Sequence, residues 1–396
     1  MGSNGTSNGH SDFPDKNSEY LKLVVPTFEE EQSQLRSSSI EWKGALPTVE
    51  SYLRREACLA SQNLTRDGGL TPWALAYEPP NSSRRVLCGC ETYRKRALVR
   101  RNGKVEDQIA YGIGGVFTPT ENRGHGYARR MLTELAKRLQ VFEAARGEQI
   151  AFSALWSDIG KKFYSALGWQ AFPSAHVALP AVATVADGLP SVRFLETGDL
   201  EELCKLDEQL MRKRLVKQTA ANRTSVAMVP DLNTIIWHHA RENFVGQEVL
   251  GKKPTIRGAI VGEAGSRVWC YWTRTWKGAN EGEPDSLYIL RLAGEDDSFS
   301  DIAPASAAGV EAAKSSAVVK AVAALLAAAQ SEAAKWNMGE VNAWNPSSTV
   351  LAAAQMLDPA AKVEDRESAS ISSLLYYGEG NWENVDWIAN EKFMWC

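Results

Sequence analysis

Apolar residues in the first half of the chain recur at the spacings of strands and helices. Residues 86–93 and 108–118 carry the apolar content expected of two strands. Asn102-Gly103 lies between them, and both residues tolerate positive φ, so a tight hairpin is expected there. The elements expected upstream are a strand at 21–25, a helix at 48–60 and a strand at 73–77.

A helix, a strand, a short helix and a last strand are expected after the hairpin. The buried face of the first helix is marked by apolar residues at helical spacing, namely Tyr127, Met131, Leu132, Leu135, Leu139 and Phe142. Residues 150–156 form the next strand, and Ser157 suits the N-cap of a short helix. The last strand of the first half is expected at residues 176–179.

The same order of elements returns in the second half in a weaker form. The expected elements are strands at 192–195, 259–261, 268–276, 287–292, 340–344 and 371–377, and helices at 199–215, 310–336 and 349–357. We therefore expect a mixed α/β fold whose second half is a diverged copy of the first. The expected division is a disordered tail at 1–18, a first domain at 19–180, a linker at 181–191 and a second domain at 192–396.

Composition describes an ordinary globular protein. Hydrophobic residues make up 44% of the chain and charged residues 23%, and the net charge of −4 argues against a nucleic-acid partner. No apolar run approaches the roughly 20 residues of a membrane span, and the N-terminus has no signal-peptide pattern. The six cysteines are scattered, and Cys88-Gly89-Cys90 lacks a second pair, so we expect no metal site and a cytoplasmic protein.

The loop before the helix that starts near residue 127 has the form of a phosphate cradle. The first amides of a helix have no internal partners and carry the positive end of its dipole, so they attract anions. Gly124 and Gly126 leave these amides uncovered, and Arg123 adds a charged donor. The sequence therefore predicts a pyrophosphate site at this loop.

Two motifs around the strand at 150–156 resemble those of the GNAT acetyltransferase superfamily. The first is Val116-Phe117-Thr118-Pro119 followed by Arg123-Gly124-His125-Gly126-Tyr127-Ala128, with one extra residue before the arginine. The second is the set Ser157, Gly160, Phe163, Tyr164, Gly168 and Trp169, in which Ser157 and Gly160 replace the Asn and Ala of the family pattern. A closer likeness to the fungal L-lysine N6-acetyltransferases of lysine catabolism rests on residues 154–164, 237–241 and 390–396.

The resemblance implies a GNAT fold that binds acetyl-CoA, followed by a second, degenerate GNAT-like domain. By this likeness the amides of Phe117 and Thr118 bind the pantetheine arm, and an amide near Val116 or Phe117 polarises the thioester carbonyl. The resemblance also implies that the pyrophosphate is bound by the backbone amides of Gly124, His125, Gly126, Tyr127, Ala128 and Arg129. The His125 ring is expected to face solvent. Tyr164 matches the residue that protonates the leaving thiolate, although it also suits a core position on an amphipathic helix.

The general base is less defined by the sequence. A lysine ammonium near pKa 10.4 costs roughly 4.6 kcal/mol to deprotonate at pH 7, so the enzyme must supply a proton acceptor. The strand at 108–118 offers no interior carboxylate. The candidates are Glu91 on the neighbouring strand, acting through water, and His238 or His239 from the second domain.

The second domain is expected to shape the acceptor site rather than to bind acetyl-CoA. Residues 293–297 carry three carboxylates where the cradle would stand, and these would repel a pyrophosphate. Residues 269–276 are aromatic on both faces of a strand, which fits core packing. Alternatively, Trp272 and His239 line a pocket for a cationic amine, with Arg274 near a carboxylate.

The expected function is transfer of acetyl from acetyl-CoA to the ε-amine of free L-lysine. The alternatives are another small amine or a protein lysine as acceptor, and a CoA-binding regulatory protein without activity. Residues 1–6 also match the pattern for N-terminal myristoylation, although no polybasic patch follows as a second membrane signal. The oligomeric state is left open by the sequence.

Overall fold

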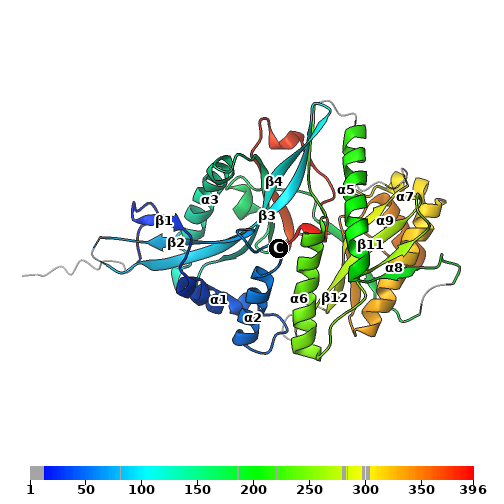
Figure 1. Cartoon of the computed structure of the whole chain (residues 1–396), viewed down its shortest axis with the longest axis horizontal. Helices are drawn as coiled ribbons and strands as arrows, with labels where there is room; N and C mark the ends of the chain where they lie inside the picture. The colour runs from blue at the N-terminus through cyan, green and yellow to red at the C-terminus, as the bar shows by residue number, and fades with distance from the viewer. Residues whose placement is uncertain are drawn as a thin grey trace, which may run out of the picture.

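Two mixed sheets stand side by side, with helices on their faces (Figure 1). The computed structural model describes residues 13–80, 82–184, 187–218, 222–278, 282, 284–296, 299 and 304–396. Residues 1–12, which include the possible myristoylation site, lie outside the described residues. The predicted mixed α/β class is confirmed.

The first sheet has the order β1-β2-β3-β4-β5-β15-β6, and β9 pairs with both β3 and β16. Its strands are β1 (Leu21–Val24), β2 (Leu70–Tyr77), β3 (Arg85–Arg101), β4 (Lys104–Phe117), β5 (Ile150–Ser157), β6 (Gln170–Ala171), β9 (Thr224–Met228), β15 (Ile371–Tyr376) and β16 (Val385–Trp387). The long hairpin of β3 and β4 turns at Asn102 and Gly103, whose φ values are 51° and 76°. Both central residues therefore have the positive φ that the sequence predicted.

The second sheet has the order β14-β7-β13-β12-β11-β10-β8. Its strands are β7 (Ala175–Pro180), β8 (Arg193–Leu195), β10 (Gly258–Val261), β11 (Val268–Thr275), β12 (Ser286–Gly294), β13 (Glu340–Trp344) and β14 (Glu364–Asp365). Only β12 and β13 pair in parallel within this sheet. Strand β12 is therefore joined to β13 by the crossover that contains the core helix α8 (Ala317–Lys335).

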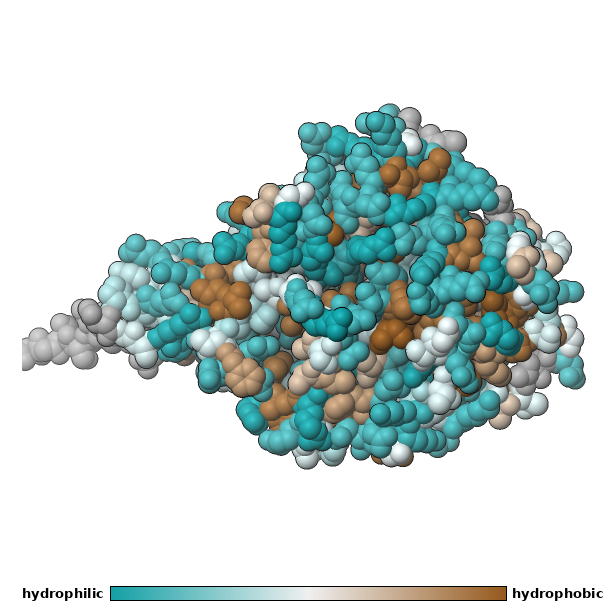
Figure 2. Space-filling view, viewed as in Figure 1, coloured by the Kyte–Doolittle hydropathy of each residue, from teal (hydrophilic) through white to brown (hydrophobic). Residues whose placement is uncertain are grey.

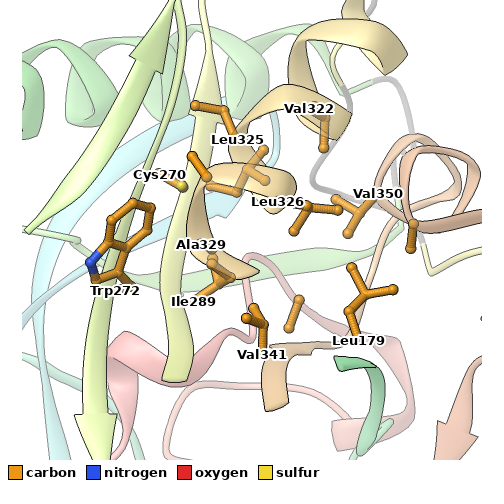
Figure 3. Packing of buried hydrophobic residues seen from close by; sticks show 14 of the residues in the cluster. Leu179, Cys270, Trp272, Ile289, Val322, Leu325, Leu326, Ala329, Val341 and Val350 are labelled. Carbon is orange, nitrogen blue, oxygen red and sulfur yellow. The ribbon is translucent and has the colours of Figure 1, made fainter. Parts of the chain in front are cut away.

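The two sheets exchange strands across the predicted linker. Strand β7 precedes residues 181–191 yet pairs with β13, and β15 follows them yet pairs with β5 in the first sheet. Figure 3 shows Leu179 of β7 packed with Val341 and Val350 from the second half of the chain. The sheets thus do not follow the boundary at 181–191, and the division of function between two domains stays a prediction.

The helices cover the sheets, and most of them begin after a residue whose side chain accepts a hydrogen bond from the first turn. They are α1 (Phe28–Trp42), α2 (Val49–Ala60), α3 (Tyr127–Ala144), α4 (Lys162–Ser165), α5 (Leu200–Lys217), α6 (Leu232–Leu250), α7 (Ala307–Ala313), α8 and α9 (Ser348–Leu357). The sequence pattern did not predict α1, α6, β6, β9, β14 or β16. It also joined α7 and α8 into one helix, whereas Ser316 accepts a hydrogen bond from the Val318 amide and starts a new helix there.

Helix α8 forms the centre of the second core. By length and composition it could cross a membrane, but most of it is buried inside the protein against β10, β11 and β13. Its many alanines allow close approach to the sheet, and Val322, Leu325 and Leu326 fill the remaining space (Figure 3). The face of the molecule in Figure 2 is mainly hydrophilic, with hydrophobic residues in separate patches.

Candidate acetyl-transfer site

Strands β4 and β5 separate at the end of their pairing. They run parallel from Ile109↔Ile150 to Ile113↔Leu155, and β4 then continues to Phe117 beyond the last paired residue. On its other edge β4 follows β3, with an irregularity in register between Gly89 and Glu91. Residues 114–117 therefore present backbone groups toward a gap in the sheet, where a ligand can take the place of a strand.

The phosphate cradle has the open geometry that its glycines predict. Gly124 and Gly126 have φ values of 85° and 81°, and a side chain on either residue would be strained. Gly126 is the N-cap of α3, where no side chain caps the first amides and the first turn contains no acidic residue. A Cβ on Gly124 would meet nothing within 4 Å. The start of α3 thus has room and charge suited to an anion.

Arg123 is held at the mouth of this cradle. Its Nε donates to the Thr118 carbonyl oxygen at 2.9 Å, and its guanidinium lies 5.6 Å from the centre of the Phe117 ring. Glu41 of α1 pairs with it at 3.3 Å. The side chain is half exposed, so it can turn toward an incoming phosphate.

Residues 13–17 lie over the cradle, which corrects the prediction of a disordered tail for this part of 1–18. The Phe13 ring stacks on His125 with centroids 4.3 Å apart, and the Tyr127 hydroxyl donates to the Pro14 carbonyl oxygen at 2.7 Å. Arg130 donates to the Lys16 carbonyl oxygen at 3.1 Å. The His125 ring is exposed, as expected, but one of its faces is covered by Phe13.

A cavity of about 1070 Å³ joins the gap between β4 and β5 to the interface with α6. It is lined by residues from α1, α2, the strands β3, β4 and β5, the cradle loop, α4, α6 and the end of the chain. The predicted cofactor residues on this lining are Val116, Phe117, Thr118, Arg123 and Ala128. Ser157 is buried beside it, where its hydroxyl donates to the Gly160 carbonyl oxygen and accepts from the Ile159 amide.

Tyr164 lines the cavity from α4. Its side chain is 7% exposed and contacts Phe163 edge to face. Burial raises the pKa of the Tyr164 hydroxyl above its ordinary value, so the group stays protonated at neutral pH. The hydroxyl has no hydrogen-bond partner among the residues that the structure describes, which leaves its proton available to a ligand in the cavity.

Glu91 lines the same cavity from β3. The Tyr93 hydroxyl donates to Glu91 Oε2 at 2.8 Å. Burial, and then the nearby Glu56 carboxylate, raise the pKa of Glu91 to about 7, while the hydrogen bond from Tyr93 opposes the shift. A carboxylate with a pKa near the working pH is suited to general-base catalysis.

Two further carboxylates lie near Glu91 on the cavity wall. Glu31 of α1 has a pKa raised by burial, and its charge contributes to the raised pKa of Glu91. Glu56 of α2 accepts a hydrogen bond from Arg55 Nε at 2.7 Å. This end of the cavity is therefore acidic and suited to a cationic group.

The structure places His238 and His239 away from the cavity lining, which corrects their prediction as candidate bases. His238 Nε2 donates to the Phe393 carbonyl oxygen at 2.9 Å, and His239 Nε2 donates to the Trp272 carbonyl oxygen at 3.0 Å. Both rings are buried, and burial lowers the pKa of His238 and brings the pKa of His239 to about 3. Because both rings are weakly basic and already bonded to the backbone, their role is in the packing of α6.

Trp272 and Arg274 are also interior residues, so the predicted acceptor pocket at β11 is not formed. Trp272 is fully buried in the core shown in Figure 3, and its Nε1 donates to the Ile256 carbonyl oxygen. Arg274 is 1% exposed and pairs with Glu242 at 3.1 Å and Glu332 at 2.6 Å. Core packing, the first interpretation of residues 269–276, is the one that the structure supports.

The second half contributes other residues to the cavity that the sequence analysis did not select. Trp237 and Arg241 of α6 line it, together with Trp395 and Cys396 near the end of the chain. Figure 1 places the last residue at the centre of the molecule, between β3 and α6. Trp237 and Arg241 are four residues apart and so share one helix face. The four-residue spacing of Trp237 and Arg241 would have predicted a shared face only if residues 232–250 had first been predicted as a helix.

A metal site is absent from the described part of the chain, since no group of three or more His, Cys, Asp or Glu residues could hold an ion. Cys88 and Cys90 are buried free thiols on β3. They face Met131 and Tyr164, and burial raises the pKa of each thiol above its ordinary value. Neither thiol is therefore ionised at neutral pH.

The chain matches one family model and is similar to two curated relatives. The family model described as the LYC1 GNAT-like C-terminal domain matches residues 176–396. A protein of Yarrowia lipolytica named "Lysine acetyltransferase" is 25% identical over 274 residues, which is 59% of this chain and 67% of the relative. The uncharacterized protein YGR111W of Saccharomyces cerevisiae is 24% identical over 288 residues, which is 63% of this chain and 69% of the relative.

Among solved structures, a GCN5-related N-acetyltransferase from Kribbella flavida matches with a TM-score of 0.47 and 15% identity, covering 89% of this chain and 70% of that one. The family match extends over more than half of the chain, and its region includes α6 and the C-terminal residues that complete the cavity. The chain therefore belongs to the family defined by the LYC1 GNAT-like C-terminal domain and is an acyl-CoA-dependent acetyltransferase.

Proposed function

We propose that this enzyme transfers the acetyl group of acetyl-CoA to the ε-amine of free L-lysine. The observation that carries the proposal is the position of Glu91 in the cavity, beside further carboxylates and in the same space as Tyr164. An acidic wall attracts a cationic amine, and a base with a pKa of about 7 can take its proton. The Yarrowia lipolytica relative is named a lysine acetyltransferase, which supports lysine as the residue or amino acid that accepts the acetyl group.

The first step is deprotonation of the amine. A free ammonium near pKa 10.4 is almost fully charged at pH 7, and roughly 4.6 kcal/mol separates it from the neutral nucleophile. Glu91 receives the proton, directly or through water, and the hydrogen bond from Tyr93 steadies the carboxylate that accepts it. Glu31, which lines the same wall, attracts the cation toward Glu91 before the transfer, while Glu56 is paired with Arg55.

The second step is attack of the neutral amine on the thioester carbonyl. Backbone groups at residues 114–118 bind the pantetheine arm in the gap beside β4, and the amides at the start of α3 bind the pyrophosphate. An amide near Val116 or Phe117 stabilises the negative charge that develops on the carbonyl oxygen. Collapse of this intermediate breaks the carbon–sulfur bond, the amine nitrogen releases its second proton to water, and Tyr164 gives its proton to the thiolate of CoA and regains one from solvent.

The contribution of α6 to the cavity favours a small acceptor. Trp237 is buried and packs edge to face on Tyr93 with centroids 5.5 Å apart, so it forms a wall beside Glu91. Trp395 and Cys396 add to the same wall. An amino acid fits within this space, whereas a lysine inside a protein would have to bring its backbone past α6.

The test is a thiol-release assay with matched acceptors. Free L-lysine should have the highest kcat/KM, and cadaverine, which lacks the carboxylate, should be lower by about 10²-fold or more because buried polar partners reject an analogue that leaves them unpaired. A lysine inside a peptide should also be poor. Equal turnover of the peptide would replace this proposal with a protein-lysine acetyltransferase, and equal turnover of cadaverine would replace it with a general amine acetyltransferase.

A cytoplasmic location and a role in lysine degradation are part of the same proposal. The cysteines are all free thiols, which is usual in a reducing compartment. Cell fractionation would test the location. Growth of a deletion strain on lysine as sole nitrogen source, with and without a Tyr164→Phe copy of the gene, would test the role.

A further inference from the structure

Arg241 has an unusual position in the acceptor part of the cavity. It lies one turn after Trp237 on α6, and both residues line the cavity wall. Its side chain is half-buried, and its guanidinium carbon lies 5.5 Å from the centre of the Trp395 ring. Within the described residues it makes no ion pair and no hydrogen bond, so its five donors are open to a ligand.

Three buried arginines in this half of the chain are neutralised by carboxylates, while the half-buried Arg366 donates to the Ala175 and Ser370 carbonyl oxygens. Arg257 pairs with Glu242 and donates to Asn243 Oδ1 at 2.8 Å. Arg274 pairs with Glu242 and Glu332, and Arg291 pairs with Asp207 at 2.8 Å. Burying a guanidinium without such a partner costs free energy, which a bound anion would recover.

The surroundings of Arg241 leave its charge in place. Burial, and then the nearby Arg55, lower the pKa of Arg241 to about 10, which still keeps it protonated at neutral pH. Arg55 is itself paired with Glu56 and donates to the Trp42 carbonyl oxygen at 3.1 Å. Contact with the Trp395 ring stabilises the guanidinium less than a well-formed pair with a carboxylate in a desolvated site would.

Tyr93 connects this cation to the catalytic carboxylate. Its hydroxyl donates to Glu91, and its ring packs on Trp237, the residue one helical turn before Arg241. A ligand that spans the cavity from Glu91 to Arg241 therefore meets an acidic end first and a cationic end second. The two ends match the side-chain ammonium and the α-carboxylate of a basic amino acid.

We propose that Arg241 binds the α-carboxylate of the acceptor amino acid and so selects free amino acids over simple amines. This inference rests on the proposed function, since it names the residue that binds the α-carboxylate of the substrate in that function. The planar guanidinium can form two parallel hydrogen bonds with a carboxylate, which fixes the orientation of the chain that carries the reacting amine.

The test compares lysine and cadaverine in wild-type enzyme, Arg241→Gln and Arg241→Lys. Arg241→Gln should lower kcat/KM for lysine by about 10²-fold, through KM, while leaving kcat/KM for cadaverine and KM for acetyl-CoA unchanged. Arg241→Lys should recover part of the loss, because it restores the charge but not the paired donors. Arg54→Gln is the matched control, since Arg54 is exposed on α2 and pairs with Glu248 outside the cavity lining.

The outcomes separate this inference from the proposed function. If wild-type enzyme uses cadaverine as well as lysine, the free amino-acid acceptor is wrong whatever the variants do. If the wild type prefers lysine and Arg241→Gln keeps that preference, Arg241 does not read the carboxylate. An equal loss for lysine and cadaverine, accompanied by a lower melting temperature, would assign Arg241 a structural role and overturn the inference.

Discussion

The hydroxyl of Tyr93 donates a 2.8 Å hydrogen bond to Oε2 of Glu91 inside the cavity. This bond acts against burial, which raises the pKa of Glu91, and so holds that pKa at about 7. Tyr93 also contacts Trp237 of α6, so the catalytic carboxylate is coupled to the surface that covers the acceptor. Variants of Glu91 and Tyr93 therefore test the proposed base directly.

Glu91→Gln should lower kcat by about 10²–10⁴-fold because the variant lacks the proton acceptor. In the wild type, kcat/KM should fall as the pH drops through about 7, since Glu91 is then protonated and cannot accept a proton. The variant should lose this acidic limb. A Glu91→Gln enzyme with wild-type activity and the same pH profile would exclude Glu91 as the base.

Tyr93→Phe should move the acidic limb of the profile to higher pH. The hydrogen bond from Tyr93 stabilises the charged carboxylate and lowers its pKa, so its removal raises the pKa further. The pH dependence of kcat/KM for lysine measures this shift, and activity at high pH should be largely kept. A shift to lower pH would contradict the arrangement of these two residues.

Tyr164→Phe should lower kcat by about 10²-fold or more if protonation of the thiolate limits the reaction, with little change in acetyl-CoA affinity. The control is Tyr377→Phe, which removes a hydroxyl bonded to Ser153 outside the cavity lining. Single-turnover kinetics and calorimetry would measure the two effects. Full activity in the Tyr164 variant would make this residue a packing aromatic.

Gly126→Asp should weaken acetyl-CoA binding by about 10²-fold because it sets a negative charge at the first amides of α3. Positive φ also strains the new residue, so the control must carry the same strain. Gly147→Asp provides it, since Gly147 has a φ of 74° at the other end of α3, with open space around its Cβ position. Equal affinity of the two variants by calorimetry would move the pyrophosphate site elsewhere.

Arg274→Met should destabilise the fold by about 3–5 kcal/mol, because it leaves buried carboxylates without their partner. Lys335→Met is the control, since Lys335 is exposed and also pairs with Glu332, and should cost at most about 1 kcal/mol. Urea unfolding measures both. If Arg274→Met is fully stable yet selectively loses activity with lysine, Arg274 belongs to the acceptor site after all.

Local signals in the sequence determined most elements and the cofactor half of the site. The turn at Asn102-Gly103, the cap at Thr48 and the glycines at 124 and 126 act within a few residues, so their conformation follows from their own chemistry. The mixed α/β class and the position of Tyr164 on a helix after β5 could be predicted for the same reason. The prediction of Ser157 as a helix N-cap was wrong, because Ser157 ends β5 and α4 begins only after Lys161.

Tertiary structure alone decided the acceptor half. Four consecutive residues of α6 each face a different direction, so the packing of this helix determined that His238 and His239 bond the backbone in the interior while Trp237 and Arg241 line the cavity. The exchange of β7 and β15 pairs Pro180 with Glu340 and Ser157 with Ile371, which are far apart in the sequence. The pKa of Glu91 depends on burial and on charges from two helices, which no short stretch of sequence encodes.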